Sequence, residues 1–366
     1  MKRRALLFPF NSEIAPVIKN RHLLVQHEVV YCVSPIGYGL HKKDASFCYC
    51  GEATGIIVTD EIVSWDFDDL IICESNSDFD DVILPQIISA ASNSKNIILS
   101  YAINNKLLQK VTNICIKYNV TLTLLEYNKV NTQKLKGKDE ILSINIPVVF
   151  VTSVIENTNK FDIQLCLRDY FINEGFRVSQ LGSKQYCELF GFHTIPKFMF
   201  TNQYTEKEKI ILFNRVCKSI EIQENPDIII IGVPGSTMVF NNIITNNFGI
   251  IPFEISNAVH PDAAIMSITH ENYDVDFLEM IKESTRYKLG FDINCFNLAN
   301  KKFDSLKSKE EKRLRYITVD AEQADKKIQV LSDSSTPIFN SLNSKSSLKM
   351  CKLIENFLSV QNFEVI

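Results

Sequence analysis

The chain has 366 residues, of which 45% are hydrophobic and 22% are charged, and its formal net charge at pH 7 is −4. This balance excludes a disordered or fibrous chain and is typical of a globular protein with enough core for two domains. Neither half of the sequence carries a long basic stripe, so nucleic acid is not expected as a main partner.

The amino terminus and the cysteines predict a cytoplasmic location. The opening basic residues are followed by an apolar run, 5–10, that is too short for the hydrophobic region of a signal peptide. No later segment is long and apolar enough to span a membrane. Ten cysteines without a signal sequence are expected to be reduced thiols. His41, Cys48 and Cys50 do not match the spacing of a common zinc site, so no metal is predicted.

The first third of the chain alternates short apolar runs with helical segments. The candidate strands are 4–10, 28–33, 55–59, 70–73, 96–101 and 121–126, and the candidate helices are 80–92 and 106–118. This alternation predicts a Rossmann-like α/β domain over residues 1–130, built on an open and mostly parallel sheet. The pair Gly37 and Gly39 lacks the third glycine of a dinucleotide-binding fingerprint. The segment 34–54 is therefore interpreted as a surface loop that could line a ligand crevice.

A polar stretch, 128–139, is the predicted boundary with a second α/β domain over residues 145–366. The candidate strands of this domain are 146–154, 176–181, 226–231, 250–255, 263–269, 291–297 and 315–319. Its candidate helices are 161–174, 186–191, 206–222, 274–289 and 344–359.

The strand 146–154, the polar turn behind it and the next helix have the local plan of a phosphate-binding P-loop. In that motif, G-x-x-x-x-G-K-[ST], backbone N–H groups at the helix N-terminus bind phosphate and the lysine reaches the outer phosphates. With Lys160 as the lysine, the glycine positions hold Val154 and Asn159, and the Ser/Thr position holds Phe161. Asn159 is a plausible substitute for glycine, because asparagine tolerates left-handed backbone.

The motif departs from the full P-loop at its metal position. Phe161 cannot bind magnesium, so Asp162 or Thr158 would have to do so. One interpretation is a nucleotide site with ATP and magnesium as the possible cofactor. The other is an ordinary turn between a strand and a helix, with an exposed lysine.

Polar residues follow several predicted strands, and the carboxyl ends of parallel strands meet at one edge of a sheet. The candidate ligand-binding residues there are Ser153, Asn157, Thr158, Asn159, Lys160, Phe161, Asp162, Gln180, Ser183, Gly235 and Ser236. The candidate catalytic residues, at and beyond the end of the predicted strand 250–255, are Glu254, His260 and Asp262. An imidazole and a carboxylate at that edge could act as an acid–base pair. The alternative is a turn histidine that hydrogen-bonds its own loop.

Distinctive segments of the chain resemble the family of peptide maturation system proteins, which are encoded in clostridial clusters beside a radical-SAM maturase and a short bacteriocin-like precursor. The segments that carry this resemblance are 7–10, 33–40, 156–161, 178–183, 187–193, 231–235 and 253–259. The resemblance implies a role in the maturation of a ribosomally synthesised, post-translationally modified peptide. It implies the precursor peptide or the maturase as partner, and it supplies a pathway without a reaction.

The chain is also similar to a two-domain family that joins a Rossmann-like domain to a P-loop domain. In that family the lysine follows the first loop glycine by seven positions and precedes Met-Thr. Here Ser153 stands seven positions before Lys160, and 161–162 replace Met-Thr. The stretch 260–263 is similar to the Q-P-D-A of that family, whereas 232–236 lack the acidic residue that ends its second apolar strand. The likeness implies the same architecture and favours binding of an anionic ligand over ATP hydrolysis.

Two functions remain open from the sequence. The first is an accessory or tailoring protein that acts on such a peptide and binds a nucleotide or another anionic ligand near Lys160. The second is a non-catalytic partner that binds the precursor peptide or the radical-SAM maturase. A homodimer is compatible with either function.

Overall fold

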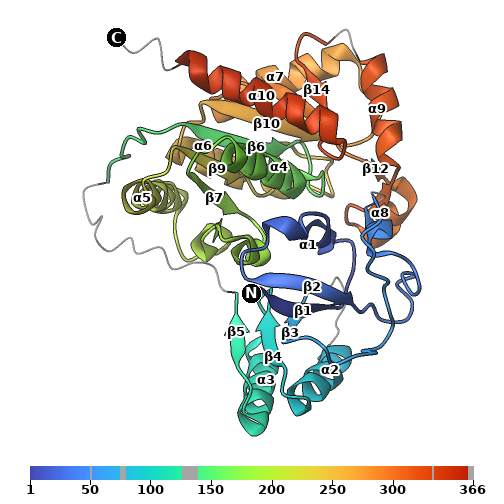
Figure 1. Cartoon of the computed structure of the whole chain (residues 1–366). Helices are drawn as coiled ribbons and strands as arrows, with labels where there is room; N and C mark the ends of the chain where they lie inside the picture. The colour runs from blue at the N-terminus through green and yellow to red at the C-terminus, as the bar shows by residue number, and fades with distance from the viewer. Residues whose placement is uncertain (50–51, 75–79, 126–138, 332–333, 362–366) are drawn as a thin grey trace. The chain divides into compact units, whose positions relative to one another are not determined.

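The chain forms two compact units in the computed structural model, which describes residues 1–49, 52–74, 80–125, 139–331 and 334–361 (Figure 1). Unit 1 comprises Met1–Tyr127 and Lys184–Thr194, and unit 2 comprises Asn128–Ser183 and Ile195–Ile366. The segment Lys184–Thr194 thus belongs to unit 1, although the predicted division assigns it to the second domain. Most of the predicted polar boundary, 128–139, lies outside the described residues. Among the helices that are described, none combines the length and the apolar character needed to cross a membrane.

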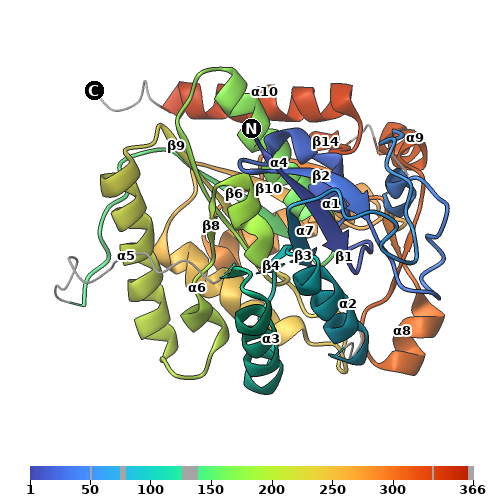
Figure 2. The ribbon, with the colours of Figure 1, turned by 60° about the horizontal axis from the view of Figure 1, so that its bottom comes forward.

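Unit 1 is built on a parallel sheet of five strands in the order β2-β1-β3-β4-β5. The strands are β1 (Arg3–Phe8), β2 (His27–Cys32), β3 (Asp69–Ile72), β4 (Asn96–Leu99) and β5 (Leu122–Leu124). The helices α2 (Asp80–Ser92) and α3 (Asn105–Tyr118) lie side by side (Figure 2). Side chains from alternate strand positions, such as Leu70 and Ile72, form one core cluster with these helices. The predicted Rossmann-like parallel sheet is confirmed.

The remaining elements of unit 1 are short. They are α1 (Ala15–Lys19), η1 (Arg21–Leu23), η2 (Ala45–Cys48), η4 (Gln185–Phe190) and β8 (His193–Thr194). The predicted strand 55–59 is wrong, since this segment forms only isolated bridges, from Thr59 to Val33 and from Ile57 to Asp44. The Asp44 carboxylate accepts hydrogen bonds from the backbone N–H groups of Thr54 and Gly55, and these bonds hold the segment as a loop.

Unit 2 is built on a sheet whose parallel strands follow the order β14-β11-β10-β6-β9-β7. They are β6 (Val148–Ser153), β7 (Val178–Gly182), β9 (Ile228–Gly232), β10 (Ala263–Ile268), β11 (Cys295–Leu298) and β14 (Ile338–Phe339). A separate antiparallel pair is formed by β12 (Lys301–Phe303) and β13 (Tyr316–Thr318). The 3-10 helices are η5 (Lys197–Phe200) and η6 (Asn246–Gly249). The α-helices are α4 (Lys160–Asn173), α5 (Glu206–Glu224), α6 (Ile250–Ala258), α7 (Val275–Leu289), α8 (Ser305–Glu311), α9 (Ala321–Val330) and α10 (Ser344–Gln361).

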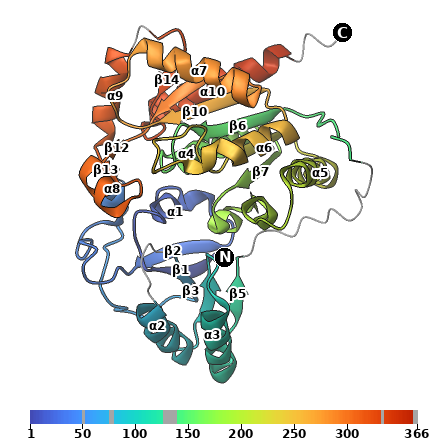
Figure 3. The same cartoon turned by 180° about the vertical axis from the view of Figure 1, so that it is seen from behind.

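Both faces of the unit 2 sheet are covered by helices, as the continuous apolar runs of its strands require. In β6, Val149 and Val151 pack in one cluster with residues of α4 and α10, which lie in front of the sheet in Figure 1. Val148 and Phe150 pack in another cluster with residues of α5 and α6, and Figure 3 shows α6 and α7 from that side. The order strand, lysine-bearing turn, helix is therefore built into a doubly wound α/β unit like that of P-loop proteins.

The predicted strand 250–255 is wrong, because this segment begins helix α6. Gly249, with a φ of 73°, provides the left-handed residue before the helix. Pro252 lies in the first turn, where a missing N–H group costs no hydrogen bond. The buried residues recur at helical spacing and are Pro252, Glu254, Ile255, Ser256 and Ala258. Packing against α5 outweighs the β-branched composition that favoured a strand.

Replacing Gly249 by alanine should destabilise unit 2 by about 1–3 kcal/mol. Besides the positive φ, a Cβ atom there would lie 2.7 Å from the backbone oxygen of Thr237 and 2.8 Å from Nζ of Lys288. Gly290, with a φ of 79° and no atom within 4 Å of the position that a Cβ would occupy, carries the strain without the clash. In thermal unfolding followed by circular dichroism, Gly249→Ala should have a lower melting temperature than Gly290→Ala. Equal melting temperatures would contradict the clash.

Candidate anion-binding site

Lys160 is the first residue of α4. It follows the end of strand β6 and so lies at the carboxyl edge of the unit 2 sheet. Its Nζ donates hydrogen bonds to the backbone oxygens of Val233, at 2.9 Å, and Gly235, at 2.7 Å. Both oxygens belong to the loop that follows the neighbouring strand β9. The side chain is half-buried, so the interpretation of Lys160 as an exposed turn lysine is wrong. The ammonium group joins the two turns that sequence analysis placed at this edge.

The turn before Lys160 has the backbone conformation that a glycine-containing loop would adopt. Asn157 has a φ of 59° and Asn159 a φ of 61°, both in the left-handed region. The prediction that Asn159 can replace a loop glycine is confirmed for the backbone. Asn159 also holds its surroundings in place, because its Nδ2 donates to Oδ2 of Asp162 at 3.3 Å and its Oδ1 accepts from the N–H group of Asn300 at 3.3 Å.

The ends of β6 and β9 are tied together around the same turn. The N–H group of Thr237 donates to the backbone oxygen of Ser153 at 3.0 Å, and Oγ of Ser153 lies 3.5 Å from the oxygen of Gly235. Ser236, the next residue, is 1% exposed, and its Oγ has no hydrogen-bond partner among the described residues. The structure therefore brings together Ser153, Asn159, Lys160, Gly235 and Ser236, as the sequence predicted. A buried hydroxyl without a partner is a group that a bound ligand would satisfy.

The residues at the metal position do not fit magnesium. Phe161 is 8% exposed and stands where a P-loop carries its metal-binding hydroxyl. Oγ1 of Thr158 donates to the backbone oxygen of Ile155 at 3.3 Å, and Asp162 accepts from Asn159. Within the described ranges, no group of three or more His, Cys, Asp or Glu residues could hold a metal ion.

Two of the candidate cysteine–histidine ligands can be located. Nδ1 of His41 lies 3.2 Å from Oδ1 of Asp60, and Cys48 is half-buried in η2. Cys50 lies outside the described residues.

Gln180 and Ser183 differ in how deeply they are buried. Gln180 is the third residue of β7 and fully buried, and neither of its side-chain amide atoms has a hydrogen-bond partner in the part of the chain that the structure describes. Ser183 follows the last residue of the strand and is half-buried. Lys184, the residue after Ser183, belongs to unit 1. Its Nζ lies 3.1 Å from Oε2 of Glu13 and 3.5 Å from Oε2 of Glu74.

The expected position of His260 and Asp262 in the crevice is wrong. Both residues precede strand β10, so they lie at the amino edge of the sheet, opposite to Lys160. Oδ2 of Asp262 accepts a hydrogen bond from the N–H group of Val148, the first residue of β6, at 2.7 Å. Nε2 of His260 lies 3.0 Å from the backbone oxygen of Gly290. The prediction failed because 250–255 is part of helix α6 and not a strand. A strand would end at the carboxyl edge of the sheet, whereas α6 leads the chain back to the amino edge.

Glu254 is likewise outside the crevice. It lies on α6, is 0% exposed, and its Oε1 is 3.4 Å from Nζ of Lys209 on α5. Burial raises the pKa of the Glu254 carboxyl, and the ion pair with Lys209 offsets only part of this effect. The arrangement is a buried ion pair between the helices α5 and α6.

Sequence analysis missed two buried polar residues beside the turn. The Ser267 hydroxyl in β10 donates to the backbone oxygen of Thr158 and accepts from Nδ2 of Asn297 at 3.0 Å. The N–H group of Asn300, beyond the end of β11, donates to Asn159. The sequence signal for Ser267 was its hydroxyl in the otherwise apolar strand 263–268. Hydrophobic periodicity alone does not show whether such a residue lies in the core or at a site.

Neither a protein-family model nor a curated protein matches the sequence. Among solved structures, the chain is similar to a DUF1611 family protein from Anabaena variabilis, with a TM-score of 0.59 and 9% sequence identity over 97% of this chain and 100% of that chain. An apo GTPase from Pyrococcus abyssi gives a TM-score of 0.31, with 14% identity over 58% of this chain and 97% of that chain. The signal recognition particle 54 kDa protein of Aeropyrum pernix, in complex with GDP, gives a TM-score of 0.30, with 11% identity over 76% of this chain and 62% of that chain. The first of these likenesses shows that the chain shares the fold of the DUF1611 family protein over nearly its whole length.

Proposed function

We propose that unit 2 binds a nucleotide or another phosphate-bearing anion at the turn around Lys160. The observation that carries this proposal is the position of the Lys160 ammonium. It stands at the N-terminus of α4, at the carboxyl edge of a parallel sheet, 2.7–2.9 Å from two loop oxygens. A helix N-terminus and a cation at this edge are the two features that favour phosphate in an α/β unit.

A phosphate oxygen would compete with the two carbonyl oxygens for the Lys160 ammonium. The bonds to the carbonyl oxygens pair a cation with neutral acceptors, whereas a phosphate oxygen adds the attraction between opposite charges, and this favours the exchange when the ligand is anionic. The buried hydroxyl of Ser236 next to Gly235 offers an additional donor. The left-handed Asn157 and Asn159 curve the backbone so that it can surround such a group.

The resemblance to peptide maturation system proteins supports a place for this binding in the modification of a ribosomally synthesised, bacteriocin-like peptide. In this proposal the chain is an accessory or tailoring protein, and the precursor peptide or the radical-SAM maturase is its partner. The ligand at Lys160 would then drive or gate the interaction with that partner.

A second function, that of a non-catalytic partner protein, is favoured by the groups that the turn lacks. Phe161 replaces the metal-binding hydroxyl, and β9 ends in Gly232 without an acidic residue behind it. Phosphoryl transfer from ATP depends on a metal ion that neutralises the developing charge. These two positions therefore support binding without hydrolysis.

Calorimetric titration of the full chain with ATP, GTP, ADP and GDP tests the proposal. We expect binding of at least one of them, with an affinity that changes little when magnesium is removed, because Phe161 offers no metal ligand. Turnover of the nucleotide should stay at the level of the buffer control. If no titrant binds at about millimolar concentration, which is a weak affinity for any nucleotide site, the anion-site proposal is wrong and the partner-protein function stands alone.

A further inference from the structure

A cavity of about 380 Å³ lies within unit 1, and none of its lining residues is among the candidate site residues of the sequence analysis. Its polar end, at the amino edge of the sheet, is formed by Arg3, His27, Asp69 and Asn96, which are the first residues of β1, β2, β3 and β4. The first residues of parallel strands meet at one edge of a sheet, and the topology therefore gathers four polar side chains from distant parts of the sequence. The volume is within the range of small-molecule sites in proteins.

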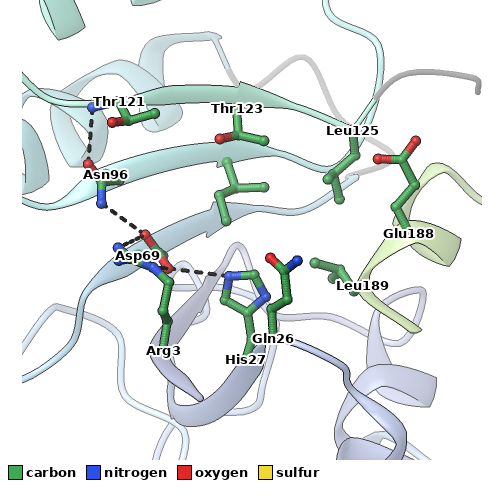
Figure 4. Close-up of a pocket in the computed structure, with 11 residues that line it drawn as sticks. Arg3, Gln26, His27, Asp69, Asn96, Thr121, Thr123, Leu125, Glu188 and Leu189 are labelled. Carbon is green, nitrogen blue, oxygen red and sulfur yellow. Dashed lines mark hydrogen bonds and ion pairs between the residues drawn. The ribbon is translucent and has the colours of Figure 1, made fainter. Parts of the chain in front are cut away.

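The Asp69 carboxylate is the centre of this polar end (Figure 4). Arg3 donates to both of its oxygens at 2.6 Å, and Nδ2 of Asn96 donates to Oδ1 at 3.2 Å. Nε2 of His27 lies 3.3 Å from Oδ2. Since the single negative charge of Asp69 is already paired with Arg3, we assign His27 as neutral. Its hydrogen is on Nε2, because a carboxylate can only accept.

The second ring nitrogen of His27 is then a hydrogen-bond acceptor without a partner. His27 is 6% exposed, and its Nδ1 is buried with no hydrogen-bond partner among the described residues. In Figure 4 this nitrogen lies on the side of the ring away from Asp69, toward Gln26. A buried acceptor that lines a cavity is satisfied when the cavity holds a ligand with an N–H or O–H group.

The charged groups of the lining already have partners. The charge of Asp69 is paired with that of Arg3, and Glu188 has an interaction partner of its own. An ionic head group at His27 would therefore lose its hydration without gaining a counter-ion, which is costly. A neutral hydroxyl group avoids this cost. It can donate to Nδ1, and its oxygen can accept from the amide of Gln26, an exposed residue on the same side of the ring.

The lining also indicates the length of the ligand. It runs from His27 on β2 to Thr123 on β5, and these are the two outer strands of the sheet. Neighbouring strands lie about 4.8 Å apart, so the cavity extends about 19 Å across the sheet. Its apolar side chains are Ile98, Leu125 and Leu189. We propose that the cavity binds an unbranched alcohol, whose hydroxyl group donates to Nδ1 of His27 and whose alkyl chain lies against these apolar side chains.

Four compounds of similar length test the head group: 1-hexanol, its isomer 1-methoxypentane, hexylamine and hexanoate. The full chain, labelled with ¹⁵N in its six histidines, reports on the ring nitrogens of His27. The titrations are run at about pH 8, where imidazole is ordinarily neutral and the amine is still protonated. We expect 1-hexanol to shift the His27 resonances with a dissociation constant on the order of millimolar.

The other three compounds should bind at least about tenfold more weakly than 1-hexanol. The ether has no hydrogen-bond donor and leaves Nδ1 unsatisfied, and the two ions find no counter-ion at His27. Among alcohols, the affinity should rise from 1-butanol through 1-hexanol to 1-octanol, by up to about fourfold for each CH₂ group, which is the gain that burial of one such group gives. An affinity that stops rising at four carbons would contradict the long alkyl site.

The variant His27→Phe keeps a ring in the lining and removes the acceptor. In saturation-transfer NMR, which observes the ligand, it should bind 1-hexanol as weakly as the wild type binds the ether, and its affinity for the ether should be unchanged. His22→Phe, at an exposed histidine of unit 1 outside the lining, is the matched control and should bind 1-hexanol as the wild type does. If circular dichroism shows that His27→Phe is unfolded, the comparison of alcohol and ether on the wild type decides.

Equal or tighter binding of the ether, the amine or the carboxylate overturns the proposal. So does the absence of any shift up to about 20 mM 1-hexanol, which would leave the four polar residues with a purely structural role. The site belongs to unit 1, so neither result depends on whether unit 2 binds an anion at Lys160.

Discussion

Replacing Lys160 by alanine is expected to weaken the binding of a nucleotide or phosphate-bearing ligand by about tenfold to more than a hundredfold. Loss of a charge-assisted hydrogen bond costs about 1.5–3 kcal/mol, which corresponds to that range of affinity. Lys160→Met, which keeps the apolar stem and removes the ammonium group, should lose as much. Isothermal titration calorimetry on both variants measures the effect.

The matched control is Lys207→Ala, at a lysine of the same unit whose side chain is 68% exposed. It should leave the affinity unchanged. Because Lys160 Nζ joins the turn to the oxygens of Val233 and Gly235, Lys160→Ala should also lower the free energy of unfolding, by about 1–3 kcal/mol. Affinities therefore have to be compared at a temperature where both proteins are folded. A folded Lys160→Ala variant that binds with wild-type affinity would refute the role given to this side chain.

Replacing Asp69 by alanine is expected to lower the free energy of unfolding of unit 1 by about 1–3 kcal/mol, because it leaves the buried His27 and the partly buried Asn96 and Arg3 without their acceptor. The side chain of Asp69 is 3% exposed and accepts from Arg3, His27 and Asn96. Trp65 is the single tryptophan of the chain and packs at the unit 1 core, 5.9 Å from the ring of Phe67. Its fluorescence during urea unfolding therefore reports on unit 1.

Asp66→Ala is the control for this measurement. Asp66 pairs with Arg4 on the surface, with a side chain that is 69% exposed, so its loss should cost at most about 1 kcal/mol. Equal destabilisation by the two substitutions would mean that the polar end of the cavity does not stabilise the sheet.

The effect of Asp69 should depend on pH. Burial alone would raise the pKa of its carboxyl, but the hydrogen bonds from His27, Arg3 and Asn96 outweigh burial and hold the pKa well below its usual range. A carboxylate with a lowered pKa contributes stability that is present above the pKa of the unfolded chain, about 3.9. That stability is lost as the pH falls through the pKa of the folded protein. The difference between wild type and Asp69→Ala should be constant near neutral pH and should shrink below about pH 4.

The sequence by itself determined the class of fold and the position of the lysine-bearing turn. Alternation of short apolar runs with amphipathic segments is a local property, so the two parallel sheets and most of their helices could be predicted from periodicity. The left-handed backbone of Asn159 could also be predicted, because asparagine adopts a positive φ more often than most residues other than glycine. Its φ is 61°. The presence of Phe161 at the position of the metal-binding hydroxyl was likewise evident from the sequence.

Only the tertiary structure decided which polar residues meet. The segment 250–255 has the composition of a strand and becomes α6 because its apolar side chains pack against α5, and this change moves His260 and Asp262 to the opposite edge of the sheet. The partners of Lys160 come from a loop more than seventy residues away in the chain. The polar end of the unit 1 cavity is assembled from the first residues of four strands, and each of them taken alone is an ordinary strand boundary. Strand order and register place these residues together, and they depend on long-range packing that no local pattern encodes.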